Sequence, residues 1–158
     1  MSIFENSTLG VSAVSAESSV GKAVSTRSNI FEMTQLAESA VLRPMEYGMF
    51  PHDVRAALAY RIAISAGETR LAEYYAALAG DKFNLSDYIM IEGEPESTLI
   101  PFVDKAANDT KNIVAEDISK LQSVGVSDAD FVWLCELIAF EAYQVRVAAG
   151  LRLMNGAV

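Results

Sequence analysis

The chain has 158 residues, of which 51% are hydrophobic and 21% charged, and its formal net charge is -9. This length suggests one domain with a sizeable core, and the composition excludes a disordered chain. The acidic balance repels phosphate backbones and anionic lipid, so neither nucleic acid nor a membrane surface is expected as a partner. We expect no secretory signal and no bilayer span. The single cysteine, Cys135, excludes an internal disulfide and indicates a cytoplasmic protein.

Residues 1–28 are rich in Ser, Ala, Val and Gly and have no helical period. Terminal segments of this kind are commonly poorly ordered. We therefore expect a flexible N-terminal arm, followed by a single folded domain over residues 29–158. The alternative is that the arm becomes ordered against a partner subunit.

The first helix of the domain is expected to begin at Asn29 and to end before Pro44, because a residue that precedes proline is disfavoured in a helix. Its apolar residues recur at helical spacing. We expect these residues to form the buried face: Ile30, Met33, Leu36, Ala37, Ala40 and Val41.

An alanine-rich helix is expected to start near Pro51, since proline suits the first helical turn. Gly67 is expected to break this helix, and residues 68–78 are expected to continue as another helix that ends at Gly80. Dense alanine would let these helices approach each other and their neighbours closely.

The acidic segment 81–99 is expected to be an exposed crossover, with a lid over a site as the alternative. Pro101 is expected to open a helix that extends to about Asp109, and a further helix is expected from about Val114 to Val124. No segment alternates strongly with period two, so the predicted fold class is all-α.

The last helix is expected to run from Ser127 to about Leu153 and to be the centre of the fold. Ser127 and Asp130 have the spacing of a capping box. The helix is apolar on nearly all sides, so we expect its own domain and a neighbouring subunit to cover it. A buried charge needs a partner, so we expect Glu136 or Glu141 to pair with an arginine.

Two stretches resemble one known family: RAALAYRIAISAGETRLAEYY (Arg55–Tyr75) and LQSVGVSDADFVWLCELIAFEAYQVRVAAGLRL (Leu121–Leu153). They are similar to the AhpD-like alkylhydroperoxidase / carboxymuconolactone decarboxylase (CMD) superfamily, and most of all to its peroxidase-related CMD-domain branch. The resemblance implies an AhpD-like multi-helix domain. It also implies an oligomeric helical bundle, a homo-oligomer of two, three or six subunits.

The resemblance also implies where the chemistry of the family would lie. In the peroxidase branch a glutamate activates a Cys-x-x-Cys pair, whose first thiolate attacks peroxide and whose second cysteine resolves the sulfenate, and a histidine completes the relay. Here the glutamate position is Ala56, the cysteine positions are Glu68 and Leu71, and the histidine position is Tyr75. None of the four groups is present, so we expect thiol peroxidase activity to be lost.

The same comparison implies a candidate pocket at the turn around Gly67 and beside the last helix. Glu68 would act there as a general base, and Arg61 or Arg146 would hold an anionic substrate. The alternative is that these charges form buried ion pairs that fix helix register or a subunit interface. The candidate residues are Arg61, Glu68, Leu71, Tyr75, Glu141 and Arg146.

No cofactor and no metal site are expected, because no set of donors has suitable spacing. The sole histidine, His52, is expected at a helix start on the surface, and Cys135 is expected to be a structural thiol. The predicted function is therefore that of a non-catalytic partner of an intact AhpD-like paralogue, or of a small-ligand binder. The alternatives are a thiol-independent decarboxylase or isomerase acting on a small carboxylated substrate, and residual alkylhydroperoxidase (antioxidant) activity.

Overall fold

The computed structural model describes residues 3–83 and 96–156, which form helices and connecting turns and contain no strand. This confirms the all-α fold class. Most of the acidic segment 81–99 lies outside the described residues. In chain order, the helical elements are η1 (Ile3–Glu5), α1 (Ser7–Val11), α2 (Ser19–Ser25), α3 (Ser28–Leu42), α4 (His52–Ser65), α5 (Thr69–Ala79), η2 (Gly80–Phe83), α6 (Glu96–Asn108), η4 (Thr110–Asn112), α7 (Ala115–Ser123) and α8 (Asp128–Met154).

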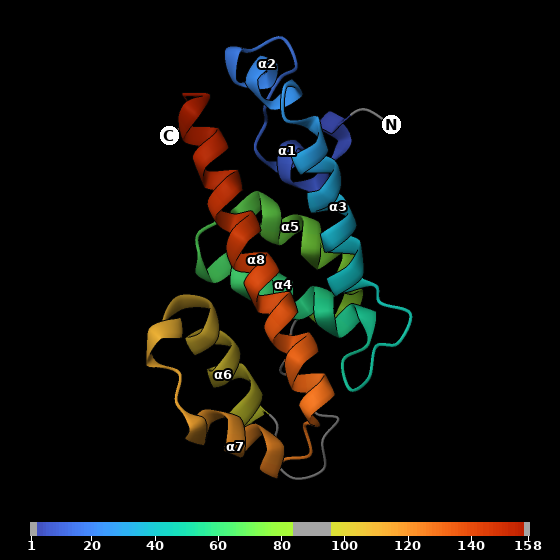
Figure 1. Ribbon diagram of the computed structural model, residues 1–158, viewed down its shortest axis with the longest axis vertical. Coiled ribbons are helices and arrows are strands. Elements are labelled where there is room, and N and C mark those ends of the chain that lie inside the picture. Colours follow the sequence, from blue (N-terminus) through green and yellow to red (C-terminus); the bar gives the residue numbers. More distant parts are fainter. Residues whose placement is uncertain (1–2, 84–95, 157–158) are drawn as a thin grey trace.

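Helix α8 runs along the length of the molecule, and α1, α3, α4 and α6 all contact it (Figure 1). It begins as its sequence predicts, because the Ser127 hydroxyl oxygen accepts a hydrogen bond from the backbone N–H of Asp130 at 3.1 Å. Leu134, Leu137 and Ile138 are buried on its inner side. The predicted central position of this helix is confirmed. None of the helices among the described residues is long and apolar enough to cross a membrane.

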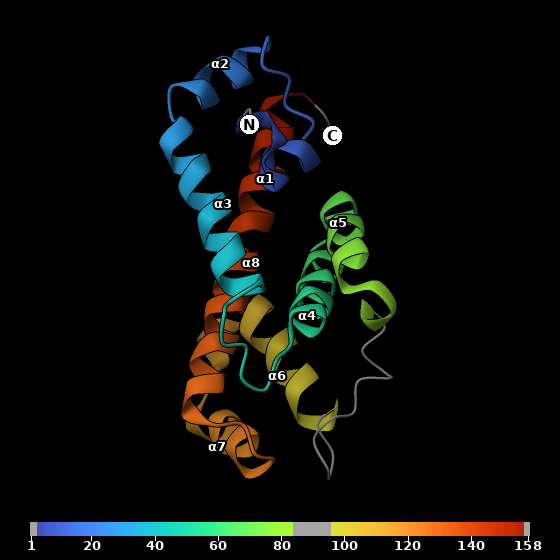
Figure 2. The ribbon, with the colours of Figure 1, turned by 90° about the vertical axis from the view of Figure 1, so that its right-hand side faces the viewer.

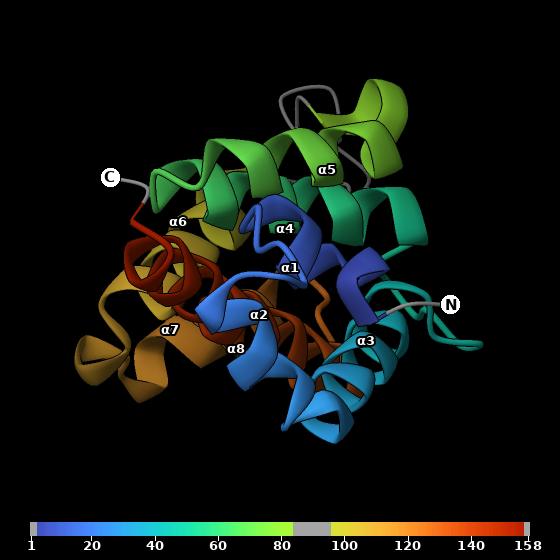
Figure 3. The same ribbon diagram turned by 90° about the horizontal axis from the view of Figure 1, so that it is seen from above.

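Helices α4 and α5 form a hairpin that lies against one side of the α3–α8 pair (Figures 2 and 3). Gly67 sits between them with φ +77°, and Gly80 ends α5 with φ +56°, both in the left-handed region that glycine adopts at little cost. Leu58 and Leu71 are fully buried in the core between these layers. The predicted break and stop of the hairpin are both confirmed.

The N-terminal segment is folded, in contrast to the loosely ordered arm that its composition suggests. The side chain of Asn6 caps α1 by accepting from Thr8 N at 2.9 Å, and the side chain of Ser18 caps α2. Polar residues typical of a disordered terminus therefore act here as helix caps. The valines and leucine of the segment form a second small core: Leu9, Val14, Val20 and Val24 pack with Phe31.

Helix α3 turns a different face inward from the one that its apolar spacing predicts. Its buried residues are Phe31, Thr34, Glu38 and Leu42. By contrast, Met33 is 62% exposed and Leu36 is 70% exposed. The prediction was wrong because α3 carries two stripes, and hydrogen bonds satisfy the polar groups of the stripe that faces inward.

Helix α6 begins at Glu96, five residues before the predicted start at Pro101, which lies inside the helix. A proline in the second turn removes a single intrahelical hydrogen bond, so the helix can begin ahead of it. Helix α7, by contrast, occupies nearly the predicted range, and Gly125 follows it with φ +95°. Helix α6 packs against α8, and α7 packs against α6 (Figure 1).

Candidate functional site

Two of the four charged residues of the predicted pocket, Arg61 and Glu68, take part in separate ion pairs. Arg61 makes a bidentate contact with Asp104 on α6, with both N–O distances 2.7 Å. Glu68, at the start of α5, accepts two hydrogen bonds from the guanidinium of Arg152 on α8. Arg61 and Glu68 are therefore both engaged by partners from other helices, but the Arg61–Asp104 pair is exposed, with 40% of each side chain accessible, and is not one of the buried ion pairs of the alternative interpretation.

The uncharged residues of the predicted pocket fill space in the interior. Leu71 and Tyr75 both have no exposed surface. Leu71 belongs to the main apolar core, whereas the hydroxyl of Tyr75 reaches a group of polar side chains. Of the six predicted residues, Tyr75 and Glu141 are the two that come together in this group.

A buried polar cluster lies between α1, α3, α5 and α8. We define the cluster as Glu38, Tyr74, Tyr75, Glu141 and Gln144. The Nε2 atom of Gln144 donates to Oε2 of Glu38 at 2.8 Å, and its Oε1 atom accepts from the Tyr75 hydroxyl. Gln144 thus connects the two side chains from the opposite layers of the fold.

Glu38 is surrounded by hydrogen-bond donors. Its Oε1 atom accepts from the Tyr74 hydroxyl at 2.7 Å, and its Oε2 atom accepts from Gln144 and from the hydroxyl of Ser7 on α1. Three donors favour the ionised form of a carboxyl group even where water is excluded. Both carboxyl oxygens of Glu38 therefore have hydrogen-bond donors, although the residue is only 2% exposed.

Glu141 has the opposite environment. It is fully buried, and neither of its carboxyl oxygens has a hydrogen-bond partner among the described residues. Burial raises its pKa well above the ordinary value, the charge of Glu38 raises it further, and only the nearby Tyr75 hydroxyl opposes these effects. Glu141 is therefore the protonated member of the pair, since two neighbouring buried carboxylates cannot both ionise cheaply.

The prediction that Glu136 or Glu141 pairs with an arginine is wrong. Glu136 is exposed, and the Arg146 guanidinium donates to the carbonyl oxygen of Ala142 in its own helix. A proton on Glu141 performs the neutralisation that an arginine was expected to provide. An ion pair would need a second charged side chain from another part of the fold, whereas a protonated Glu141 needs none.

Tyr75 is a hydrogen-bond donor and not a base in this cluster. Burial raises its pKa well above the ordinary value, and the carboxyl groups of Glu141 and Glu38 raise it further. Burial likewise raises the pKa of Tyr74, with its hydrogen bond to Glu38 as the next cause. Neither phenol ionises under ordinary conditions, so no nucleophile or base is generated here.

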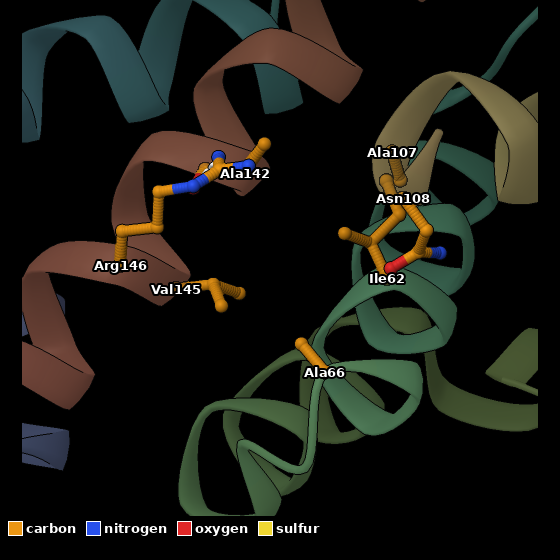
Figure 4. A pocket seen from close by; sticks show the side chains of 7 residues that line it. All are labelled: Ile62, Ala66, Ala107, Asn108, Ala142, Val145 and Arg146. Atoms are coloured by element: carbon orange, nitrogen blue, oxygen red, sulfur yellow. Dashed lines mark hydrogen bonds between the residues drawn. The ribbon is translucent and has the colours of Figure 1, made fainter. Parts of the chain in front are cut away.

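A separate shallow pocket of about 100 Å³ lies between α4, α6 and α8 (Figure 4). Arg146 stands at this pocket and is its single charged residue. The other lining residues are small or apolar apart from one amide: Ile62, Ala66, Ala107, Asn108, Ala142 and Val145. Of the six predicted site residues, Arg146 is thus the one that lines this pocket.

The remaining candidate groups show no arrangement for catalysis. Cys135 lies in the middle of α8, half-buried, and burial raises the pKa of its thiol. The His52 ring is exposed and contacts the carbonyl oxygen of Pro44 at 2.9 Å. Within the described ranges, no group of three or more His, Cys, Asp or Glu side chains is placed to hold a metal ion.

Searches against protein-family models, curated proteins and solved structures found no match to this chain. The site is therefore interpreted from its own residues.

The sequence reasoning did not include Glu38, Tyr74 or Gln144 among the candidate site residues. A signal for Glu38 was present: Phe31, Thr34, Glu38 and Leu42 follow one another at helical spacing on α3. A face that mixes apolar and polar residues in this way is easily passed over when a more apolar face is available.

Proposed function

We propose that this chain is a non-catalytic member of the AhpD-like/CMD superfamily that acts in an assembly with other subunits. The observation that carries the proposal is that the residues at the positions of the family's reactive groups are engaged in packing and hydrogen bonds. Glu68 is held by Arg152, Leu71 fills the core, and Tyr75 is a hydrogen-bonded neutral phenol. The packing of α4 against both α5 and the long last helix α8 supports the proposal.

Thiol peroxidase chemistry needs an accessible thiolate and a second thiol that resolves the sulfenate. Cys135 is the only cysteine of the chain, lies inside a helix, and has its pKa raised by burial. A two-cysteine cycle within one subunit therefore has no chemical basis in these residues.

The test is turnover of hydrogen peroxide and of an organic hydroperoxide with a dithiol reductant. We expect no turnover above the rate without protein, for both the wild type and Cys135→Ser. Turnover that Cys135→Ser abolishes would contradict the proposal and identify a one-cysteine peroxidatic centre.

The proposed assembly is a homo-oligomer, with association to an intact AhpD-like paralogue as a further possibility to be tested by co-purification. Its support is the exposed apolar face of α3, formed by Ile30, Met33 and Leu36, beside the partly exposed Tyr143 of α8. Thr34 joins the two helices through a 2.9 Å hydrogen bond with the Tyr143 hydroxyl. Apolar faces of this kind on a folded domain commonly mark contacts between subunits.

Size-exclusion chromatography with light scattering measures the molar mass of the protein in solution and so tests the assembly directly. We expect the molar mass of the wild type to exceed that of a monomer. The double variant Met33→Glu/Leu36→Glu should have a molar mass closer to that of the monomer, with unchanged helix content. The matched control is Met45→Glu, since Met45 is 99% exposed but lies outside α3. A monomeric wild type would exclude the assembly.

A second candidate function is binding of a small carboxylate at the pocket beside Arg146. The observation that favours it is a guanidinium at an apolar hollow without a carboxylate partner among the described residues. The lining contains no acid or base other than this arginine, so binding is favoured over a decarboxylase or isomerase reaction.

Calorimetric titration with short-chain monocarboxylates tests this candidate, with Arg146→Gln as the variant and Arg70→Gln, on the exposed side of α5, as the control. Equal heats for all three proteins would exclude a specific site.

A further inference from the structure

Helix α1 closes the polar cluster at one end of the bundle, where it lies between α5 and α8 (Figure 3). The hydroxyl of Ser7 donates to Glu38, and Nε2 of Gln144 lies 3.1 Å from the hydroxyl oxygens of both Ser7 and Thr8. Thr8 has no exposed surface. The contacts that hold α1 at this place are therefore made largely to side chains of the cluster.

These polar contacts are supplemented by few others. Nδ2 of Asn6 donates to the carbonyl oxygen of Phe31 at 2.8 Å, and Ser7 N donates to Oε1 of Gln35 at 3.2 Å. Helix α1 also buries two apolar residues, Leu9 at 1% exposure in the second small core and Val11 at 8% exposure in the main core. A helix of five residues is not stable alone, so its position depends on these contacts and on the charge of the cluster beneath it.

No positive side chain neutralises the carboxyl pair. None of the ion pairs among the described residues involves Glu38 or Glu141. Arg43, at the end of α3, acts electrostatically on Tyr74 but donates to neither carboxyl group. The groups that face the pair from the packed elements are Ser7 and Thr8 of α1, Tyr74 and Tyr75 of α5, and Gln144 of α8.

We propose that α1 is a proton-dependent latch, which stays closed over Glu38 and Glu141 while Glu141 carries its proton and opens when that proton passes to solvent. Loss of the proton leaves two negative charges in a closed site, where Ser7, Tyr74 and Gln144 already donate to Glu38 and the Tyr75 hydroxyl is the one donor near Glu141 among the described residues. Opening admits water to both carboxylates. This inference concerns access to the cluster and does not depend on the proposed assembly or on Arg146.

The linkage between proton and latch has a definite sign. The closed form binds a proton that the open form releases near the ordinary pKa of a glutamic acid, 4.5. Over the pH range in which the closed form is protonated and the open form ionised, the opening equilibrium constant rises about tenfold for each pH unit. Below that range the latch is closed most firmly, and above the pKa of the closed form the effect levels off.

Hydrogen–deuterium exchange of the full chain measures the opening. We expect the protection of residues 3–14, corrected for the intrinsic pH dependence of exchange, to fall about tenfold per pH unit between the ordinary pKa of a glutamic acid, 4.5, and the raised pKa of Glu141 in the closed form. In Glu141→Gln, a neutral side chain of nearly the same shape, the corrected protection should not change with pH. Glu136→Gln, an exposed site on the same helix, should behave as the wild type.

If the corrected protection of the wild type does not change with pH, the proposal is overturned without the need for a variant. It is also overturned if the protection of Glu141→Gln falls with pH as steeply as that of the wild type. If Glu141→Gln does not fold, Glu141→Leu provides the same neutral test. Protection at high pH that is restored by Mg²⁺ or Ca²⁺ would also overturn it, because a metal ion would then neutralise the pair.

Infrared spectroscopy locates the proton independently of the latch. At neutral pH the wild type should show the carbonyl stretch of a protonated carboxylic acid, and Glu141→Gln should lose it, whereas Glu38→Gln should retain it. Loss of the band in Glu38→Gln alone would place the proton on the other carboxyl group and contradict the proposal.

Discussion

Replacing Glu141 by glutamine should stabilise the protein at neutral pH, and the gain should grow as the pH rises. In the unfolded chain Glu141 titrates near its ordinary pKa of 4.5, whereas burial raises the pKa in the folded state well above this value. The folded state therefore holds one more proton between the two values. The stability contributed by this group is complete below about pH 4.5 and is lost progressively as the pH rises.

The size of the effect follows from the linkage relation. Each pH unit in that interval lowers the free energy of unfolding of the wild type by about 1.4 kcal/mol relative to a neutral variant. This is a considerable part of the ~5–15 kcal/mol that stabilises an ordinary domain.

Urea unfolding of the wild type and Glu141→Gln at several pH values measures this difference, because contributions of the other titrating groups largely cancel. Glu136→Gln, the same substitution at an exposed site on the same helix, is the control. A flat difference for Glu141→Gln, or one in which the variant loses its advantage at high pH, would refute the assignment of the proton to Glu141.

Three further substitutions test the interior by urea unfolding. Leu71→Ala should cost about 2–5 kcal/mol, because it leaves a cavity in a fully buried site, and a loss below about 1 kcal/mol would contradict the packing. Arg152→Met should lower the free energy of unfolding by about 2–3 kcal/mol, because Glu68 is left buried without its partner. The double variant Arg152→Met with Glu68→Gln should recover part of this loss. No recovery would argue against the ion pair. Tyr75→Phe should lower the free energy of unfolding by about 1–3 kcal/mol, because Oε1 of Gln144 loses its donor. The control Tyr143→Phe removes a half-exposed hydroxyl and should lower it by less than about 1 kcal/mol. Equal losses in the two variants would count against the cluster.

The ends of the helices were predictable because their signals are local. Ser127 caps α8, Gly67 and Gly80 bound the hairpin, and Pro44 follows α3, each at or near the predicted place. These signals act through the backbone of adjacent residues and need no knowledge of the rest of the fold. Pro101 was the exception. A proline can stand at the first position of a helix or within its second turn, so its presence does not fix the residue at which α6 begins.

The faces of the helices were less predictable because they depend on packing partners. On α3, Met33 and Leu36 make the more apolar stripe, yet Glu38 lies inward because donors from α1, α5 and α8 converge on it. Those donors are 31, 36 and 106 residues away along the chain. No local pattern in α3 reports them.

The candidate site was predictable in part for the same reason. The resemblance drew attention to Tyr75, and the charge within an apolar helix drew attention to Glu141, and both belong to the cluster. The rule that a buried charge needs a partner suggested an arginine for Glu141. The partner is a proton instead, a solution that has no sequence signature because it requires no second residue.

The central claim is that the chain has no peroxidatic centre, and direct reaction with peroxide tests it most simply. The full-length protein would be exposed to a small excess of hydrogen peroxide, and the oxidation state of Cys135 followed by mass spectrometry. We predict that Cys135 reacts no faster than an ordinary free thiol, since burial raises its pKa and no positive group lies beside it among the described residues. Rapid formation of a sulfenic acid at Cys135, reversed by a dithiol, would contradict the account.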